Sequence, residues 1–291
     1  MNSRAAGVAV SMVYAAFDLP DFHLIAAGQT DVGRTRSRNE DGFDLDEAAE
    51  FAVVCDGMGG HAGGDIASRT AVEAVAGALR DFMPAARAAS DRPPAPADDH
   101  DCTLSEPAGG TSVLHEAVSA VRAAVQEANQ RIHRQNRERG YADGRGMGTT
   151  LVGYWRVPGT AKLVAFHAGD SRLYRLRDGE LLALTRDHSL YQMWLDNGGT
   201  GVAPQRNIIV RALGTGGAVE PDICLYSLMP GDVYLLCSDG LNGLVPDAMI
   251  TRILAREPQP RAACAALVDA ANAAGGLDNI TVVVARLVPR A

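Results

Sequence analysis

Four aspartates beside apolar runs are the residues whose type and spacing point to chemistry. The run 51–55 is apolar throughout and leads into an aspartate that glycines follow. An aspartate before glycine is also an ordinary turn sequence, so one occurrence is weak evidence. The same construction recurs along the chain, which favours a common site made of Asp56, Asp170, Asp239 and Asp278.

Such a set of carboxylates predicts a metal site. Converging carboxylates repel one another at neutral pH unless a positive charge lies between them. An all-oxygen donor set, with no cysteine or obvious histidine ligand, selects hard cations such as Mg²⁺ or Mn²⁺. Two such ions about 3.5–4 Å apart can bind a water, lower its pKa and direct it at a phosphoryl group. Hydrolysis of a phosphate ester is therefore the predicted chemistry.

A polar segment at 30–41 carries three arginines followed by Glu40 and Asp41. A charge run of this kind is usually a solvated loop. Alternatively, one arginine holds an anion while Glu40 and Asp41 face the same site as Asp56. The segment alone does not decide between these two interpretations.

The predicted elements that position these residues form sheets covered by helices. Apolar residues at helical spacing predict two long helices on a sheet face, at 65–82 and 111–139. Short runs separated by turn residues predict an antiparallel meander at 149–156, 162–168, 173–177 and 180–184. The remaining strands are predicted at 23–29, 51–55, 225–228, 232–237 and after Asp278, with further helices at 189–196, 247–256 and 261–274.

The length of 291 residues is compatible with one large sandwich domain. We expect an N-terminal extension at 1–20 and a single domain at 21–288. Within the domain, residues 83–110 are rich in proline and aspartate and predict a surface insertion between two helices. Residues 189–207 contain a glycine-rich stretch and predict a flap.

Composition excludes some classes of function. The net charge of −8 argues against nonspecific binding of nucleic acid or of an anionic membrane. No apolar run is long enough to span a bilayer. The 5 cysteines form no CxxC pair, so neither a disulfide framework nor a zinc site is indicated, and several lie in apolar runs as expected of buried thiols in a reducing cytoplasm.

Six motifs in fixed order carry a resemblance to a known family. They are Arg36-x-x-Asn-Glu-Asp41, Asp56-Gly-Met-Gly-Gly-His61, Met147-Gly-Thr-Thr150, Gly169-Asp-Ser-Arg172, Ser238-Asp-Gly240 and Asp278-Asn279. Each motif alone is common, but the ordered set, spanning about residues 27–284, resembles the bacterial metal-dependent serine/threonine protein phosphatases of the PPM or type 2C family. The resemblance implies an α+β fold, a four-layer α-β-β-α sandwich of two antiparallel sheets flanked by helices.

The resemblance also implies roles for individual residues. The implied metal contacts are Glu40, Asp41, Asp56, the Gly57 carbonyl, Asp239 and Asp278, with a third, weaker metal at Asp170 and Asp239. Asp56 would bridge two ions of Mn²⁺ or Mg²⁺, and Glu40 and Asp41 would hold the ions directly or through waters. Arg36 would grip the substrate phosphate, so that Arg36, Asp56 and Asp239 form the catalytic set. Asn207, in the flap region after its glycine-rich stretch, would lend a carbonyl.

The sequence departs from eukaryotic relatives at Met58, where those proteins carry a histidine proposed as the general acid. His61 is nearby, but a histidine in a glycine turn is more often structural, and His167 inside a strand is expected to face the core. The glycine-rich flap is also shorter than is typical of bacterial members.

The expected function is hydrolysis of phosphoserine and phosphothreonine in proteins by a metal-bridged water. The expected partners are phosphoprotein substrates, including a cognate serine/threonine kinase, and the protein is expected to be a cytoplasmic monomer that binds neither nucleic acid nor membrane. An inactive phosphopeptide-binding module on the same fold is the alternative. A metal-dependent nuclease is disfavoured by the acidic balance.

Overall fold

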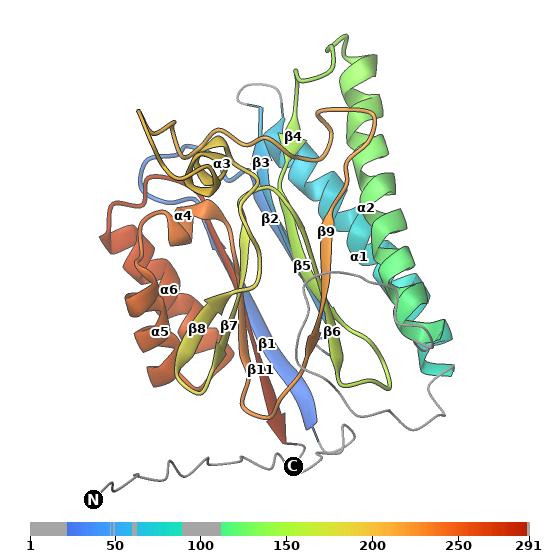
Figure 1. Cartoon of the computed structure of the whole chain (residues 1–291), viewed down its shortest axis with the longest axis vertical. Coiled ribbons are helices and arrows are strands. Elements are labelled where there is room, and N and C mark those ends of the chain that lie inside the picture. Colours follow the sequence, from blue (N-terminus) through green and yellow to red (C-terminus); the bar gives the residue numbers. More distant parts are fainter. Residues whose placement is uncertain (1–21, 47, 49, 60–62, 89–111, 290–291) are drawn as a thin grey trace, which may run out of the picture.

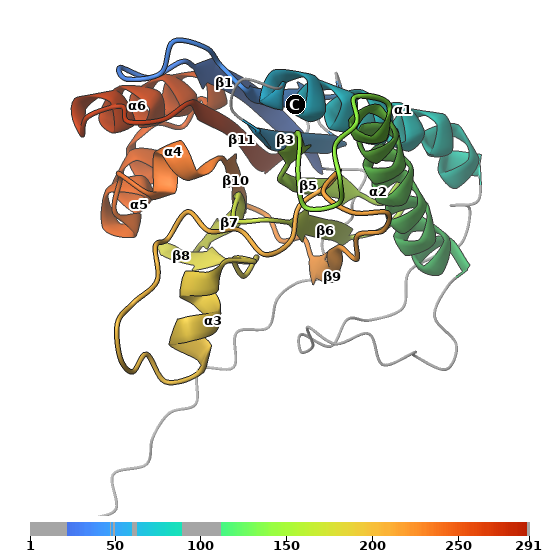
Figure 2. The ribbon, with the colours of Figure 1, turned by 90° about the horizontal axis from the view of Figure 1, so that it is seen from above.

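Two antiparallel sheets pack face to face, and helices cover the outer face of each sheet (Figures 1 and 2). The computed structural model describes residues 22–46, 48, 50–59, 63–88 and 112–289. The expected four-layer α+β sandwich is thereby confirmed. The expected N-terminal extension and residues 89–110 of the expected insertion lie outside the described residues.

The first sheet has the strand order β1-β11-β10-β7-β8. Its strands are β1 (Phe22–Asp31), β11 (Ile280–Pro289), β10 (Val233–Cys237), β7 (Arg172–Arg177) and β8 (Glu180–Ala183). Helices α5 (Asp247–Arg256) and α6 (Pro260–Ala273) lie on its outer face. The first and last strands of the chain are therefore neighbours, with Phe22 opposite Pro289 and Asp31 opposite Ile280.

The second sheet has the strand order β2-β3-β5-β6-β9, with β4 paired to β3. Its strands are β2 (Asp41–Leu45), β3 (Phe51–Met58), β4 (Gly148–Thr149), β5 (Leu151–Arg156), β6 (Lys162–Ala168) and β9 (Asp222–Ser227). The long helices α1 (Gly64–Ala88) and α2 (Ser112–Glu138) cover its outer face, as the apolar spacing predicted. Within the described segments, no helix combines the length and the apolar character needed to cross a bilayer.

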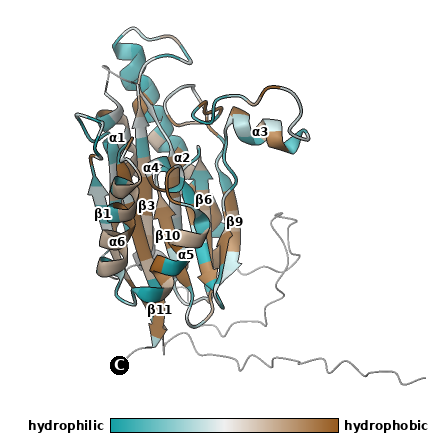
Figure 3. Cartoon of the chain, turned by 90° about the vertical axis from the view of Figure 1, so that its left-hand side faces the viewer, coloured by the Kyte–Doolittle hydropathy of each residue, from teal (hydrophilic) through white to brown (hydrophobic). Residues whose placement is uncertain are grey.

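Three apolar layers hold these four layers together, because each central strand buries both of its faces. In β3, Val53 and Cys55 face helices α1 and α2, whereas Ala52 and Val54 face the other sheet. In β10, Leu235 packs toward the helices of its own sheet, with Val233 and Cys237 on the same side. This two-sided burial explains the unbroken apolar runs, which Figure 3 shows as brown strands at the centre of the molecule.

The predicted meander at 149–184 is wrong as a single sheet. Strands β5 and β6 pair in the second sheet, whereas β7 and β8 belong to the first. The chain crosses between the sheets at Gly169, whose φ of 121° suits glycine. Strand β7 then pairs with β10, far along the chain, and periodicity within a short strand does not report such a partner.

Smaller corrections concern element boundaries. Asp41 begins a strand, β2, where the sequence indicated the end of a polar loop. The helix expected to end at Phe82 continues to Ala88, into the region predicted as an insertion. Two short helices lie at one end of the sandwich: α3 (Leu190–Asp196), which was expected, and α4 (Asp239–Asn242), which was not.

The packing of β5 on β6 yields a stability prediction. A Cβ added to Gly153 would lie 2.3 Å from the Phe166 ring, opposite on the next strand. We expect Gly153→Val to lower the free energy of unfolding by about 1–3 kcal/mol in a urea titration, because the buried ring must move. Gly77→Ala is the matched control. Its added Cβ meets nothing within 4 Å, so that change should stabilise helix α1 by about 0.5–1 kcal/mol. An unchanged midpoint for Gly153→Val would contradict the packing argument.

Candidate metal centre

The predicted acidic residues come from five separate places in the chain and meet at the end of the sandwich that carries α3 and α4. Asp41 begins β2 and is the cross-strand partner of Asp56 in β3. Asp170 follows β6, Asp239 begins α4, and Asp278 stands before β11. Strand ends, a short helix and the adjoining loops at this end of the two sheets thus supply the carboxylates.

The backbone around Asp56 is fixed by the threonines of the Met147–Thr150 motif. The Asp56 amide donates to Thr150 Oγ1 over 2.9 Å, and the Asp56 carbonyl accepts from the Thr150 amide over 2.8 Å and from Thr149 Oγ1 over 2.9 Å. Gly57 follows in close contact with its neighbours. A Cβ there would lie 2.2 Å from the Gly64 carbonyl oxygen and 2.5 Å from that of Glu40, so only glycine fits.

Glu40 and Asp41 are held by side chains from the other sheet. Asn279 Oδ1 accepts from the Glu40 amide over 2.8 Å, and Asn279 Nδ2 donates to the carbonyls of Val32 and Arg38. Ser238 Oγ donates to Asp41 Oδ2 over 2.8 Å. These bonds tie the β1–β2 loop to the loops that carry Asp239 and Asp278, so the polar segment is an ordered part of the site rather than a free solvated loop.

Asp278 carries the ion pair at the outer edge of the centre. Arg36 Nη2 donates to Asp278 Oδ2 over 2.7 Å, and the two side chains are 52% and 34% exposed. The other Asp278 oxygen accepts from the Asn279 amide over 2.8 Å. Arg36 therefore lies beside the carboxylates with its guanidinium open to solvent.

Burial and mutual repulsion shift the pKa values of these carboxyls in one direction. Burial raises the pKa of Asp56 well above its ordinary value, and the charges of Asp41, Asp239, Asp170 and Asp278 raise it further. Burial, followed by the charge of Asp239, raises the pKa of Asp170 to about 7. Burial also raises the pKa of Asp41 to about 7, against hydrogen bonds from Thr281 and Ser238 that lower it. The carboxylates are thus close enough to act on one another.

The donors present fit a hard divalent cation. Within the described part of the chain, Asp41 Oδ1, Asp170 Oδ1 and Asp239 Oδ1 are buried and have no hydrogen-bond partner. A buried, unpartnered carboxylate oxygen is costly unless a cation or a donor meets it. Clustered oxygen ligands of this kind suit Mg²⁺ or Mn²⁺.

A second cluster, His167, His188 and Asp222, brings potential ligand atoms within 4.8 Å of one another. His167 is buried as expected and stacks on His188, with ring centroids 4.5 Å apart. The Gly169 amide donates to His188 Nδ1, and Arg211 Nη1 lies 2.9 Å from His188 Nε2. Because His188 Nδ1 accepts from the Gly169 amide, Nε2 carries the ring proton and faces Asp222 Oδ2 at 3.3 Å, and Arg211 also donates to Asp222. With its donors and acceptors paired in this way, the cluster suits a structural network better than a cation site.

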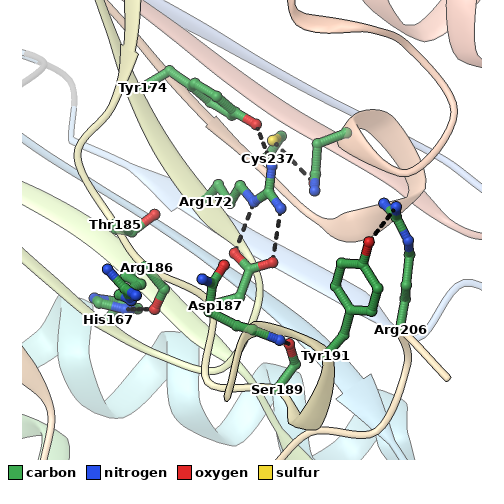
Figure 4. Close-up of polar contacts among 12 residues, drawn as sticks. His167, Arg172, Tyr174, Thr185, Arg186, Asp187, Ser189, Tyr191, Arg206 and Cys237 are labelled. Carbon is green, nitrogen blue, oxygen red and sulfur yellow. Dashed lines mark hydrogen bonds and ion pairs between the residues drawn. The ribbon is translucent and has the colours of Figure 1, made fainter. Parts of the chain in front are cut away.

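That network fastens the flap to the loop of Asp170. His188 and Gly169 exchange two bonds, because the His188 amide also donates to the Gly169 carbonyl over 2.9 Å. Arg172 grips Asp187 with two bonds of 2.7 Å and donates to the Tyr174 hydroxyl (Figure 4). Sequence reasoning missed both Asp187 and His188, because neither lies in an apolar run or in one of the repeated motifs.

The flap itself turns away from the body of the sandwich (Figure 2). Helix α3 has no buried residue, and Arg206 stacks on the ring of Tyr191 at 4.3 Å while donating to its hydroxyl (Figure 4). Asn207 is exposed. Met58 is half-buried at the end of β3, opposite Gly148, and His61 lies outside the described residues.

Comparison with known proteins gives consistent matches. The family model described as Protein phosphatase 2C matches residues 33–261. The serine/threonine protein phosphatase PstP of Mycobacterium tuberculosis is 36% identical over 267 residues, covering 90% of this chain and 45% of that protein. The serine/threonine phosphatase stp of Listeria welshimeri is 33% identical over 264 residues, covering 87% of this chain and 92% of that protein.

A solved structure also superposes over most of the chain. It is the catalytic domain of the phosphatase PstP in complex with two manganese ions, 34% identical, with a TM-score of 0.71 and coverage of 92% of this chain and 99% of the other. The chain thus spans slightly less than half of the full-length mycobacterial relative but nearly all of its catalytic domain.

The raised pKa values yield a prediction about pH and metal. The folded-state pKa of Asp41 and of Asp170 is about 7, against about 3.9 in an unfolded chain. A carboxyl whose pKa is higher in the folded than in the unfolded state adds to the free energy of unfolding. This contribution is fully present below about pH 4 and is lost as the pH rises toward 7. The protein in EDTA should therefore lose free energy of unfolding across this window. Mn²⁺ should raise the melting temperature more at about pH 7.5 than at about pH 5. Equal increments at both pH values would contradict the carboxylate cluster.

Proposed function

Because the chain belongs to the protein phosphatase 2C family, we propose that it hydrolyses phosphoserine and phosphothreonine in proteins, using divalent cations held at the candidate metal centre. One observation carries the proposal. Carboxylates from five places in the chain converge, those of Asp41, Asp56, Asp170 and Asp239 are largely buried, and three of their oxygens lack a partner within the described residues. Carboxylate oxygens without a hydrogen-bond partner are available to bind a hard divalent cation.

The proposed metal site uses the residues that the sequence singled out. They are Glu40, Asp41, Asp56, the Gly57 carbonyl, Asp239 and Asp278, with Mn²⁺ or Mg²⁺ as two core ions and a third ion at Asp170 and Asp239. The manganese in the related catalytic domain supports divalent ions of this class. When bound, the ions supply positive charge against the phosphoryl oxygens and lower the pKa of water.

The remaining tasks fall to the protein's own side chains. Arg36 lies at the open edge of the centre, and its planar fork suits two phosphate oxygens. Thr149 and Thr150 hold Asp56 in place, and Ser238 orients Asp41. Met58 carries no proton to give, so the leaving alkoxide takes its proton from water or from another group.

The proposal extends to the acting unit, its partners and its location in the cell. We infer that residues 21–288 act as one unit on phosphoprotein substrates, as a monomer, opposite a cognate serine/threonine kinase. The unpaired thiols of Cys55, Cys237 and Cys264 are buried, which supports a reducing cytoplasm as the location. An inactive phosphopeptide-binding module is the weaker alternative, because every carboxylate that the family motif requires is present.

The assay that tests this function uses purified protein with Mn²⁺, p-nitrophenyl phosphate and a phosphothreonine peptide. We expect hydrolysis of both substrates, complete loss in EDTA, and a loss of at least about 100-fold in Asp239→Ala because one metal ligand is gone. Asp269→Ala, an exposed aspartate on α6, is the matched control and should keep full activity. Protein that binds Mn²⁺ but hydrolyses neither substrate would favour the inactive module.

The exposed ion pair of Arg36 yields a second test. Arg36→Lys keeps the charge but loses the planar fork, so we expect KM for the phosphopeptide to rise about tenfold with a smaller change in kcat. Arg80→Lys is the matched control, because Arg80 pairs with Asp44 at 2.6 Å and is 47% exposed but lies away from the centre. An unchanged KM in Arg36→Lys would show that the guanidinium of Arg36 does not bind the substrate phosphate.

A further inference from the structure

The loop between β1 and β2 presents two arginines whose role the metal centre does not explain. Arg34 and Arg38 stand two residues on either side of Arg36, and all three side chains are exposed. Arg36 has a carboxylate partner in Asp278. Within the segments that the structure describes, Arg34 and Arg38 form no ion pair and no side-chain hydrogen bond.

The backbone that carries these arginines is held in place at both ends. The amides of Arg34 and Thr35 both donate to the Gly276 carbonyl, over 2.7 and 3.2 Å. The Arg38 carbonyl accepts from Asn279 Nδ2 over 2.9 Å. A fixed backbone limits the space that exposed side chains can reach, so less backbone entropy is lost when they bind a ligand.

Both arginines border the metal centre. The Arg34 stem lies against Gly276, in the turn that leads to Asp278, because a Cβ on Gly276 would lie 2.7 Å from Arg34 Cγ. On the other side of Arg36, the charge of Arg38 acts on Glu40. Burial raises the pKa of Glu40 and the charge of Asp65 adds to this, whereas the charges of Arg36 and Arg38 lower it. A cationic rim thus flanks the residue proposed to hold the phosphate.

This rim matters because the protein as a whole is acidic. A net charge of −8 repels an anionic substrate at long range. Arginine at the site edge offsets the repulsion locally, and its fork binds carboxylate or phosphate oxygens. Residues two positions apart are at most about 7 Å apart along any chain, so Arg34 and Arg38 each start close to Arg36 and to a phosphoresidue bound there.

We propose that Arg34 and Arg38 form an anion subsite that takes a carboxylate or a second phosphate on a residue next to the phosphoserine or phosphothreonine of the substrate. The subsite rests on the proposed function and deepens it by naming a substrate class. Phosphoproteins with acidic or multiply phosphorylated segments are the preferred substrates, and neutral segments are handled less efficiently.

The test compares three phosphothreonine peptides that differ only beside the phosphoresidue, with alanine, glutamate or phosphoserine there. In the metal-loaded wild type, kcat/KM should be higher for the two anionic peptides. The double variant Arg34→Gln/Arg38→Gln should lose about fivefold on both anionic peptides and little on the alanine peptide, as expected for two exposed charge pairs. The preference should shrink as salt rises from about 0.05 to about 0.5 M. Hydrolysis of p-nitrophenyl phosphate, which has no flanking residue, should fall no more than that of the alanine peptide.

A matched control separates a local subsite from net charge. Arg252→Gln/Arg256→Gln makes the same charge change at two exposed arginines of α5, in the outer helical layer. That variant should keep the wild-type preference. An equal loss in both double variants, or an equal loss on all three peptides, would overturn the subsite.

Binding measurements keep this proposal distinct from the proposed function. Non-hydrolysable phosphonate analogues of the same peptides give dissociation constants by fluorescence anisotropy, whether or not the protein is catalytically active. Tighter binding of the anionic analogues that the Arg34/Arg38 variant loses supports the subsite even if hydrolysis is absent. Wild-type affinities that do not differ among the three analogues would refute the subsite even if the enzyme is active.

Discussion

The repulsion among buried carboxylates at one end of the sandwich is the constraint on which the rest of the structure depends. Asp41, Asp56, Asp170 and Asp239 would separate if their loops were free, because burial weakens the screening by water. The fold holds these residues together with hydrogen bonds between side chains of other segments and the main chain at Asp56 and beside Asp41. Thr150 and Asn279 each link segments far apart in the chain, and both act on the main chain beside an acidic residue.

The two-sheet architecture explains why the carboxylates gather at an edge rather than in the core. Each central strand buries apolar residues on both faces, so neither face offers room for a charge. The carboxylates of the candidate centre accordingly stand near a strand end or in the segments just beyond it. Asp41 and Asp56 lie opposite one another at such a position, at the start of β2 and near the end of β3. Asp239 likewise stands outside the strands, at the start of α4 and two residues after the end of β10.

Much of this could be predicted from the sequence, and the failures have physical causes. The aspartates were found because a buried strand is an apolar run, and an acidic residue at its end is conspicuous. Strand β2 was missed because Asp-Gly-Phe-Asp-Leu has no such run and lies at the edge of its sheet. The division of 149–184 between two sheets was missed because pairing with β9 and β10 is decided by residues far along the chain. His188 was missed because its partner is a backbone amide, which leaves no pattern.

The ion pair of Arg36 with Asp278 is of the exchangeable kind that the proposed binding of a substrate phosphate by Arg36 requires. The pair is half exposed, and exposed pairs contribute only about 0–1 kcal/mol. The contrast is Arg177, whose two bonds of 2.7 and 2.8 Å reach the fully buried carboxylate of Asp232. Removing a partner from that pair would leave a buried charge uncompensated, at a cost of about 3–5 kcal/mol. The fold therefore uses the same chemical pair in two ways, as a permanent link in the interior and as an exposed one at the edge of the candidate metal centre, where the proposed phosphate binding requires an anion to displace Asp278 from the guanidinium.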